Sequence, residues 1–205
     1  MPSQVTYLMD EICLFPLPLV IFPGGKLPLQ IFEKRYIDMI RSCLKEDKGF
    51  GVLMIESGDQ VIQNEDQASP LIASCGTYCR IIDFNQQSNG LLEIILEGER
   101  KFSVLSQSES IDRLISAQVN FLDLETDSAI PDDKRHLADL LIDLSSHVST
   151  MDLVFDEESA LDVSSRLSEL LPCANFFKQQ MLELKSPLLR LEHLEDQVLK
   201  MQEDL

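Results

Sequence analysis

The chain has 205 residues, with 35 acidic and 17 basic side chains, and its formal net charge is −18. A surface that binds nucleic-acid phosphates needs clustered Lys and Arg, so this balance argues against nucleic-acid binding and against attraction to anionic membranes. The apolar fraction of 44% is that of a globular protein with a sizeable core, which excludes a disordered chain. The five cysteines include no C-x-x-C pair, so we expect a reduced, cytoplasmic protein without a metal site or a cofactor.

The first 120 residues predict strands with one inserted helix. Short apolar runs broken by prolines predict strands at 11–15, 19–22 and 27–32. Helical spacing of Tyr36, Ile40 and Cys43 predicts a helix over 33–46, with Glu33 in its first turn. Further strands are expected at 51–55, 73–84, 91–97, 101–106 and 115–121, with a hairpin turn at Asn89-Gly90. This pattern predicts a strongly curved sheet or a partly closed barrel.

After Asp123 the pattern becomes helical. Leucines at helical spacing predict helices over 133–147, 158–171, 174–184 and 188–201. We therefore divide the chain into a β-rich part, 1–122, and a helical part, 123–205. The alternating Asp123, Glu125 and Asp127 are expected to form a solvated acidic connector, since the glycine and the glutamate of a calcium loop are absent.

The acidic excess is uneven along the chain. Residues 1–120 hold 10 basic and 16 acidic side chains, whereas residues 121–205 hold 7 and 19. This distribution suggests that the helical part keeps the molecule soluble and that the less charged barrel, or its boundary with the helices, does the binding.

Motifs of nucleotide and hydrolase chemistry are missing from the sequence. The segment Pro23-Gly24-Gly25-Lys26 lacks the spacing of a phosphate-binding loop, and neither G-x-S-x-G nor H-E-x-x-H occurs. We therefore expect no enzyme activity.

One ordered set of motifs resembles the N-terminal, substrate-binding domain of the Lon proteases. The set begins with Phe15-Pro16-Leu17-Pro18, Phe22-Pro23-Gly24, Leu27-Pro28-Leu29 and Ile31-Phe32-Glu33-x-Arg35-Tyr36. It continues with Gly98-x-Arg100-x-Phe102 and ends with Arg190-Leu191-x-x-Leu194. The resemblance covers about residues 11–200.

The resemblance implies a fold and a function. The implied fold is α+β: a PUA-like six-stranded pseudo-barrel with one inserted helix, followed by a bundle of about four helices. The implied function is a non-catalytic module that recognises unfolded or tagged polypeptide, or a protein partner, since the chain has no Walker motif and no room for a Ser-Lys peptidase domain. The first interpretation of the motif residues is that they serve packing and specify the fold. The second interpretation is that they line an exposed apolar groove, in which polypeptide would contact Phe15, Phe22, Phe32, Arg35 and Tyr36.

Two other functions stay open at this point. Some PUA-like folds bind small ligands or nucleic acids, and here Lys26, Lys34, Arg35 and Arg41 form the one close basic cluster in the sequence. The chain is alternatively an adaptor in protein quality control that docks on another protein.

Overall fold

A computed structural model of the chain describes residues 10–60, 68–86, 91–147 and 154–203. The chain divides into two compact units, Met1–Asp123 and Leu124–Leu205, which we call the barrel unit and the helical unit. The predicted hairpin turn at Asn89-Gly90 lies outside the described residues.

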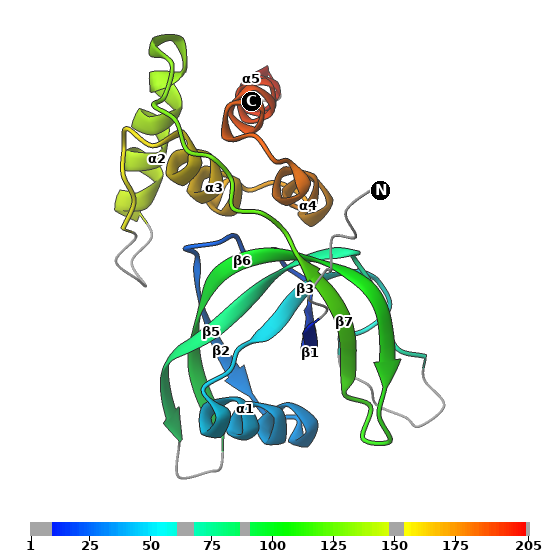
Figure 1. Cartoon of the computed structure of the whole chain (residues 1–205). Helices are drawn as coiled ribbons and strands as arrows, with labels where there is room; N and C mark the ends of the chain where they lie inside the picture. Colours follow the sequence, from blue (N-terminus) through cyan, green and yellow to red (C-terminus); the bar gives the residue numbers. More distant parts are fainter. Residues whose placement is uncertain (1–9, 61–67, 87–90, 148–153, 204–205) are drawn as a thin grey trace, which may run out of the picture. The chain divides into compact units, whose positions relative to one another are not determined.

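The barrel unit contains seven strands and one helix (Figure 1). They are β1 (Asp10–Leu17), β2 (Lys26–Ile31), α1 (Lys34–Glu46), β3 (Phe50–Ser57), β4 (Leu71–Ile72), β5 (Cys75–Gln86), β6 (Leu92–Glu109) and β7 (Ile115–Phe121). The strands follow the order β1-β7-β6-β5-β3, and β1 also pairs with β3, which closes the sheet into a barrel. Strand β2 pairs with β6, and the short β4 pairs with β3. The predicted barrel with one inserted helix is therefore confirmed.

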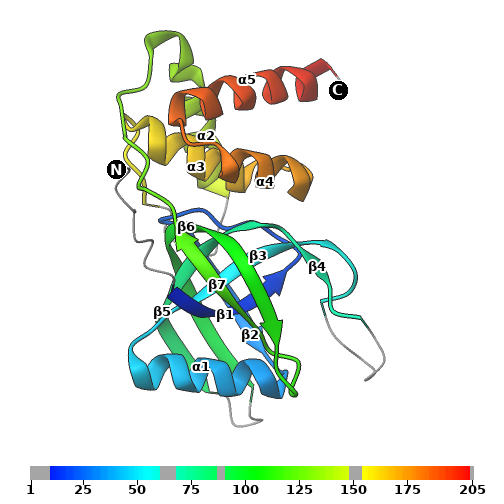
Figure 2. The ribbon, with the colours of Figure 1, turned by 45° about the vertical axis from the view of Figure 1, so that its right-hand side comes forward.

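Strand β1 is buried on both faces because it lies between two hydrophobic clusters. Ile12 and Leu14 belong to a cluster with Phe102 of β6, whereas Phe15 and Leu17 belong to a larger cluster that includes the inner face of α1. Helix α1 lies across one end of the barrel and contributes four buried side chains to that larger cluster (Figures 1 and 2). The four are Tyr36, Met39, Ile40 and Cys43. The helix thus covers apolar surface that the strands alone would leave exposed to water.

Two sequence predictions in the barrel unit are wrong. Residues 19–22 form no strand, although Val20, Ile21 and Phe22 are buried. Prolines at positions 18 and 23 flank this segment and cannot donate main-chain hydrogen bonds, and the Thr77 hydroxyl donates to the Ile21 carbonyl at 2.6 Å instead. The strands predicted at 91–97 and 101–106 form the single strand β6.

Strand β6 continues through Gly98 because a bulge absorbs one residue. Tyr78 pairs with Arg100 and Cys79 with Gly98, so Glu99 is the additional residue on β6. Gly98 also contacts the turn before β2, because the Gly24 N–H donates a hydrogen bond to the Gly98 carbonyl at 2.7 Å. A β-carbon at Gly98 would lie 2.4 Å from the Phe22 carbonyl oxygen. The glycine of this motif therefore permits two main-chain segments to meet.

The helical unit contains one 3₁₀ turn and four helices. They are η1 (Asp132–Lys134), α2 (Arg135–His147), α3 (Ala160–Leu170), α4 (Asn175–Glu183) and α5 (Pro187–Glu203). Ser159 caps α3, because its side chain accepts a hydrogen bond from the Asp162 N–H. These elements confirm the four predicted helices, whose ends differ by at most two residues from the expected ranges.

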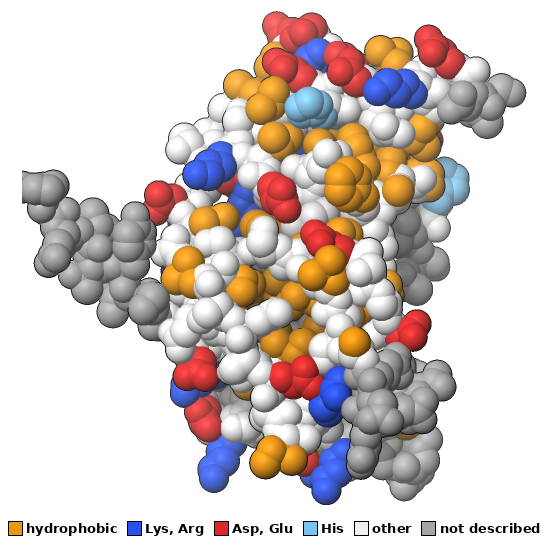
Figure 3. Space-filling view, turned by 90° about the vertical axis from the view of Figure 1, so that its right-hand side faces the viewer, with side chains coloured by type: hydrophobic (Ala, Val, Ile, Leu, Met, Phe, Trp, Pro, Cys, Tyr) orange, Lys and Arg blue, Asp and Glu red, His pale blue; other side chains and the backbone are white. Residues whose placement is uncertain are grey.

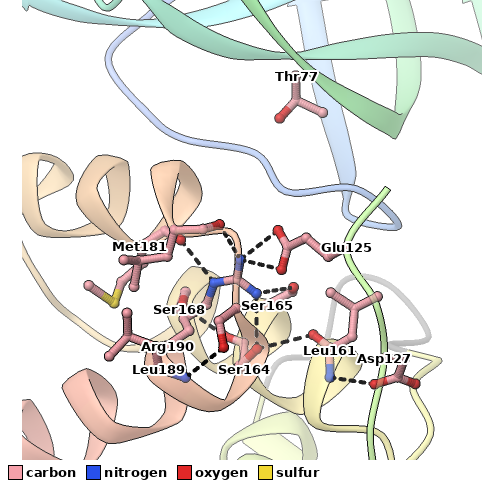
Figure 4. Close-up of polar contacts among 12 residues, drawn as sticks. Thr77, Glu125, Asp127, Leu161, Ser164, Ser165, Ser168, Met181, Leu189 and Arg190 are labelled. Atoms are coloured by element: carbon pink, nitrogen blue, oxygen red, sulfur yellow. Dashed lines mark hydrogen bonds and ion pairs between the residues drawn. The ribbon is translucent and has the colours of Figure 1, made fainter. Parts of the chain in front are cut away.

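A buried arginine organises the interior of the helical unit (Figure 4). Arg190 of α5 is fully buried, and its Nη2 donates to both carboxylate oxygens of Glu125, at 2.7 and 2.8 Å. Its Nε donates to the Met181 carbonyl at 2.9 Å, and its Nη1 donates to the Ser164 hydroxyl at 3.0 Å. The expectation of a solvated connector is therefore wrong for Glu125, because the pairing with Arg190 compensates the cost of burying its carboxylate.

We predict that Gly98→Ala destabilises the barrel unit by about 1–3 kcal/mol, because the added methyl group must push the Phe22 carbonyl away. All three tyrosines lie in residues 1–123 and the chain has no tryptophan, so tyrosine fluorescence during urea denaturation follows this unit. Ser106→Ala, at an exposed position of β6, is the control. An unchanged midpoint for Gly98→Ala would contradict the close approach.

We also predict that Arg190→Met destabilises the helical unit by about 3–5 kcal/mol, since it leaves the Glu125 carboxylate buried without its partner. The double variant Arg190→Met/Glu125→Leu should recover part of this loss because no charge is left buried. Far-UV circular dichroism during urea denaturation measures both effects. Equal stability of the single and double variants would show that the buried charge is not the cause.

Candidate functional site

Most of the predicted contact residues are buried in the barrel core. Phe15, Phe22 and Tyr36 are each less than 5% exposed. The Phe15 ring stacks on Tyr36 with ring centroids 4.1 Å apart, and it also contacts Phe50 at 6.0 Å. Burial raises the pKa of Tyr36 to about 12. These three rings form the core and have no surface to offer a ligand, which corrects the expectation that they line a groove.

Arg35 of α1 is buried too, and its guanidinium connects the residue before α1 with the turn before β7. Its Nε and Nη2 donate to the Glu33 carboxylate at 3.1 and 2.8 Å, and its Nη1 donates to the Arg113 carbonyl at 2.8 Å. The guanidinium carbon also lies 4.5 Å from the centre of the Tyr36 ring. Glu33 and Arg35 thus hold the entrance of α1. Glu33 lies at the cap position, one residue before the first turn in which the sequence predicted it.

Phe32 is the one predicted aromatic contact that reaches solvent, with 60% of its surface exposed. It follows directly after β2. On β5, Phe84 is 58% exposed and Ile82 is exposed as well. Five of the seven phenylalanines of the barrel unit are buried or partly buried, so Phe32 and Phe84 are its two exposed phenylalanine rings.

A hollow of about 330 Å³ lies on the three adjacent strands β2, β6 and β5, and we call it the sheet hollow. Its lining includes Pro28, Gln30, Phe84, Asn85, Glu93 and Ile95. The Glu93 carboxylate accepts hydrogen bonds from the side-chain amides of Gln30 at 3.2 Å and Asn85 at 3.4 Å. The hollow thus combines apolar side chains with a row of amide and carboxylate groups that crosses the three strands.

A second hollow, of about 470 Å³, runs along α1, and we call it the α1 groove. It is lined by residues of α1, β1, β5 and β7, of the turn between β6 and β7, and of the loop after α1. Two thiols line it: burial raises the pKa of Cys13, and burial raises the pKa of Cys43 to about 11. Both thiols are therefore neutral near pH 7, which makes them poor nucleophiles.

The basic cluster seen in the sequence has acidic neighbours in the structure. Arg35 pairs with Glu33 at 2.8 Å, and Arg41 pairs with Asp38 at 3.6 Å. A nucleic-acid surface requires cations that are available to phosphates, and these two guanidinium groups already contact carboxylates.

The surface carries apolar patches among acidic side chains. Figure 3 shows hydrophobic side chains gathered over the helical unit, with Asp and Glu side chains around them. None of the helices in the described part of the chain is long and apolar enough to cross a membrane. Within the same residues, no group of His, Cys, Asp and Glu side chains is arranged to hold a metal ion.

The chain belongs to the family described as the ATP-dependent protease La (LON) substrate-binding domain, whose sequence profile matches residues 11–200. Among curated proteins, Lon protease 2 of Myxococcus xanthus is 26% identical over 109 residues, which is 53% of this chain and 13% of that protein. Lon protease of Cytophaga hutchinsonii is 26% identical over 104 residues, 51% of this chain and 12% of that protein. The similarity thus spans about an eighth of the length of these relatives.

Two solved structures resemble the chain over most of its length. A Lon N-terminal domain protein from Xanthomonas campestris has a TM-score of 0.74 and 28% identity, covering 91% of this chain and 98% of that one. The N-terminal domain of a Mycobacterium avium complex Lon protease has a TM-score of 0.56 and 16% identity, with coverages of 91% and 97%. The second likeness concerns the fold alone. The resemblance recognised in the sequence is therefore confirmed.

We predict a large loss of stability on substitution of a buried phenylalanine of the barrel unit and almost none on substitution of an exposed one. Phe15→Ala should cost about 3–5 kcal/mol, because it leaves a cavity between Tyr36 and Phe50. Phe84→Ser should change the free energy of unfolding by less than about 0.5 kcal/mol, since the ring is mostly exposed. Urea denaturation followed by tyrosine fluorescence measures both. A large loss of stability in Phe84→Ser would assign this ring to packing.

Proposed function

We propose that the chain is a polypeptide-binding module that holds exposed apolar segments of unfolded or tagged proteins at the sheet hollow. The family to which the chain belongs is a substrate-binding domain, and this supports the general role. The two exposed phenylalanines supply the specific observation, because Phe84 lines the hollow and Phe32 follows β2, whose residues also line it.

Exposed aromatic rings beside a hollow are suited to unfolded chains. Unfolded polypeptides expose apolar side chains that folded proteins bury, and these side chains gain from contact with Phe84, Pro28 and Ile95. The row of Gln30, Glu93 and Asn85 offers amide and carboxylate groups to main-chain donors and acceptors. Such a surface recognises apolar character together with an accessible backbone.

We predict that Phe32→Ser/Phe84→Ser weakens the binding of an unfolded polypeptide at least tenfold, since each ring loses an apolar contact of about 1.5 kcal/mol. Fluorescence anisotropy with a labelled, permanently unfolded protein fragment measures the dissociation constant. Phe176→Ser is the matched control, because Phe176 is 67% exposed but lies in the helical unit.

The same assay separates the proposal from its alternatives. Equal weakening by Phe176→Ser, or none in the double variant, would remove the sheet hollow as the contact surface. Binding of a labelled oligonucleotide in place of the polypeptide would favour the nucleic-acid alternative. Capture of a single folded protein without binding of unfolded fragments would favour the adaptor.

A further inference from the structure

Strand β5 continues past the last residue that pairs with β3. That pairing ends at Cys79, and within the described part of the chain residues 81–86 pair with β6 alone. We call this segment the β5 edge. Its six residues extend about 20 Å, which is the usual length of a strand in a globular protein. The β5 edge is therefore long enough to pair with one more strand.

The β5 edge exposes apolar side chains and main chain together. Every residue from 82 to 86 is exposed, and two of them are large and apolar, Ile82 at 45% and Phe84 at 58%. The Phe84 N–H donates to the carboxylate of the adjacent Asp83 at 2.9 Å. In an antiparallel pair, alternate N–H groups point toward the partner strand and away from it, so this N–H belongs to the set that points away from β6. A side chain thus takes the place that a neighbouring strand would occupy.

The other edge beside the sheet hollow is blocked. Strand β2 pairs with β6 alone, and Pro28 in its middle has no N–H to donate to a further strand. The β5 edge contains no proline. Unpaired main-chain groups at a sheet edge are a template for an incoming strand, and here β5 is better suited to this role than β2.

The charges beside the β5 edge favour a basic occupant over a second copy of this chain. The lining of the sheet hollow contains two carboxylates, Asp83 and Glu93, and no Lys or Arg. Pairing of two copies along this edge would bring their Asp83 side chains near each other in molecules of net charge −18, and like charges across a strand pair are destabilising. An extended segment with a Lys or Arg side chain meets attraction instead.

We propose that the β5 edge binds an extended segment of polypeptide as an additional strand, in which apolar residues alternate and a Lys or Arg lies near the centre. This inference rests on the proposed polypeptide-binding function and specifies how the segment is held. The main chain of the segment bonds to the outward groups of β5. Its side chains lie alternately on the two faces of the sheet, one set beside Asp83 and Asn85 and the other beside Phe84.

Fluorescence anisotropy of the full chain with two labelled ten-residue peptides tests the proposal. In the first peptide, valine alternates with threonine or lysine. The second has the same side chains but carries N-methyl groups on its six central amides, which can then donate no hydrogen bond. N-methylation should raise the dissociation constant at least tenfold, because several main-chain hydrogen bonds to β5 are lost. Equal affinity of the two peptides would overturn strand addition.

The same assay distinguishes this inference from the function on which it rests. Binding of an unfolded protein fragment without binding of the first peptide would overturn strand addition and leave the polypeptide-binding function in place. Binding of neither would contradict the function itself.

Amide hydrogen exchange gives a readout that side-chain contacts alone would not change. With saturating peptide, exchange of the Phe84 amide should slow at least tenfold, because its N–H gains a main-chain partner. Ile111, exposed in the turn between β6 and β7, is the internal control and should exchange at an unchanged rate. Unchanged exchange at Phe84 would contradict the proposal. A dimer in light scattering that already protects Phe84 without peptide would assign the edge to a second copy and would overturn it as well.

The preference for a basic side chain is tested with Asp83→Asn, which removes the charge and keeps an oxygen that accepts from the Phe84 N–H. This variant should bind the lysine-containing peptide about three- to tenfold more weakly at low ionic strength. A peptide with threonine in place of lysine should lose no affinity. The matched control is Asp139→Asn, at an exposed helix position. Equal weakening by this control would show unspecific attraction to an acidic protein and would contradict the preference.

Discussion

The pairing of β1 on both of its edges is the constraint on which the barrel unit depends. β1 pairs antiparallel with β7 over residues 10–14 and parallel with β3 over residues 14–17, so one strand closes the sheet. Its two faces supply side chains to two different hydrophobic clusters. Sliding β1 by one residue would exchange these faces, so its register is fixed by burial as well as by hydrogen bonds.

Most residues of the family motif make contacts that pack the barrel unit. Phe15 and Tyr36 join β1 to α1, Arg35 joins α1 to the turn before β7, and Gly98 gives room to the turn after Phe22. Far along the chain, Arg190 performs the corresponding role in the helical unit. Of the residues that we propose to contact polypeptide, Pro28 and Phe32 belong to the motif, whereas Phe84, Asn85 and Glu93 belong to strand segments outside it.

Local patterns predicted the fold well because they depend on residue spacing. The helical leucines and the alternation in the strands act within short stretches, and they placed α1 to α5 within a few residues. Burial is decided by partners far away in the sequence. Phe15 and Phe84 are both strand phenylalanines, yet Phe15 packs against Tyr36 whereas Phe84 is exposed to solvent. Glu125 looked solvated because its partner lies 65 residues later. Phe84 lies within the polar run from Asp83 to Gln86, and this placement was the feature of the β5 sequence that indicated an exposed aromatic ring.

The central claim is that the sheet hollow holds unfolded polypeptide. Two-dimensional NMR of the isotope-labelled full chain, titrated with an unfolded protein fragment, tests it most directly. The account predicts that the largest amide shift changes fall on residues 29–30, 83–85 and 93–95, in three separate strands that share the hollow. Changes confined to residues 124–205, or spread without preference over the barrel unit, would contradict it.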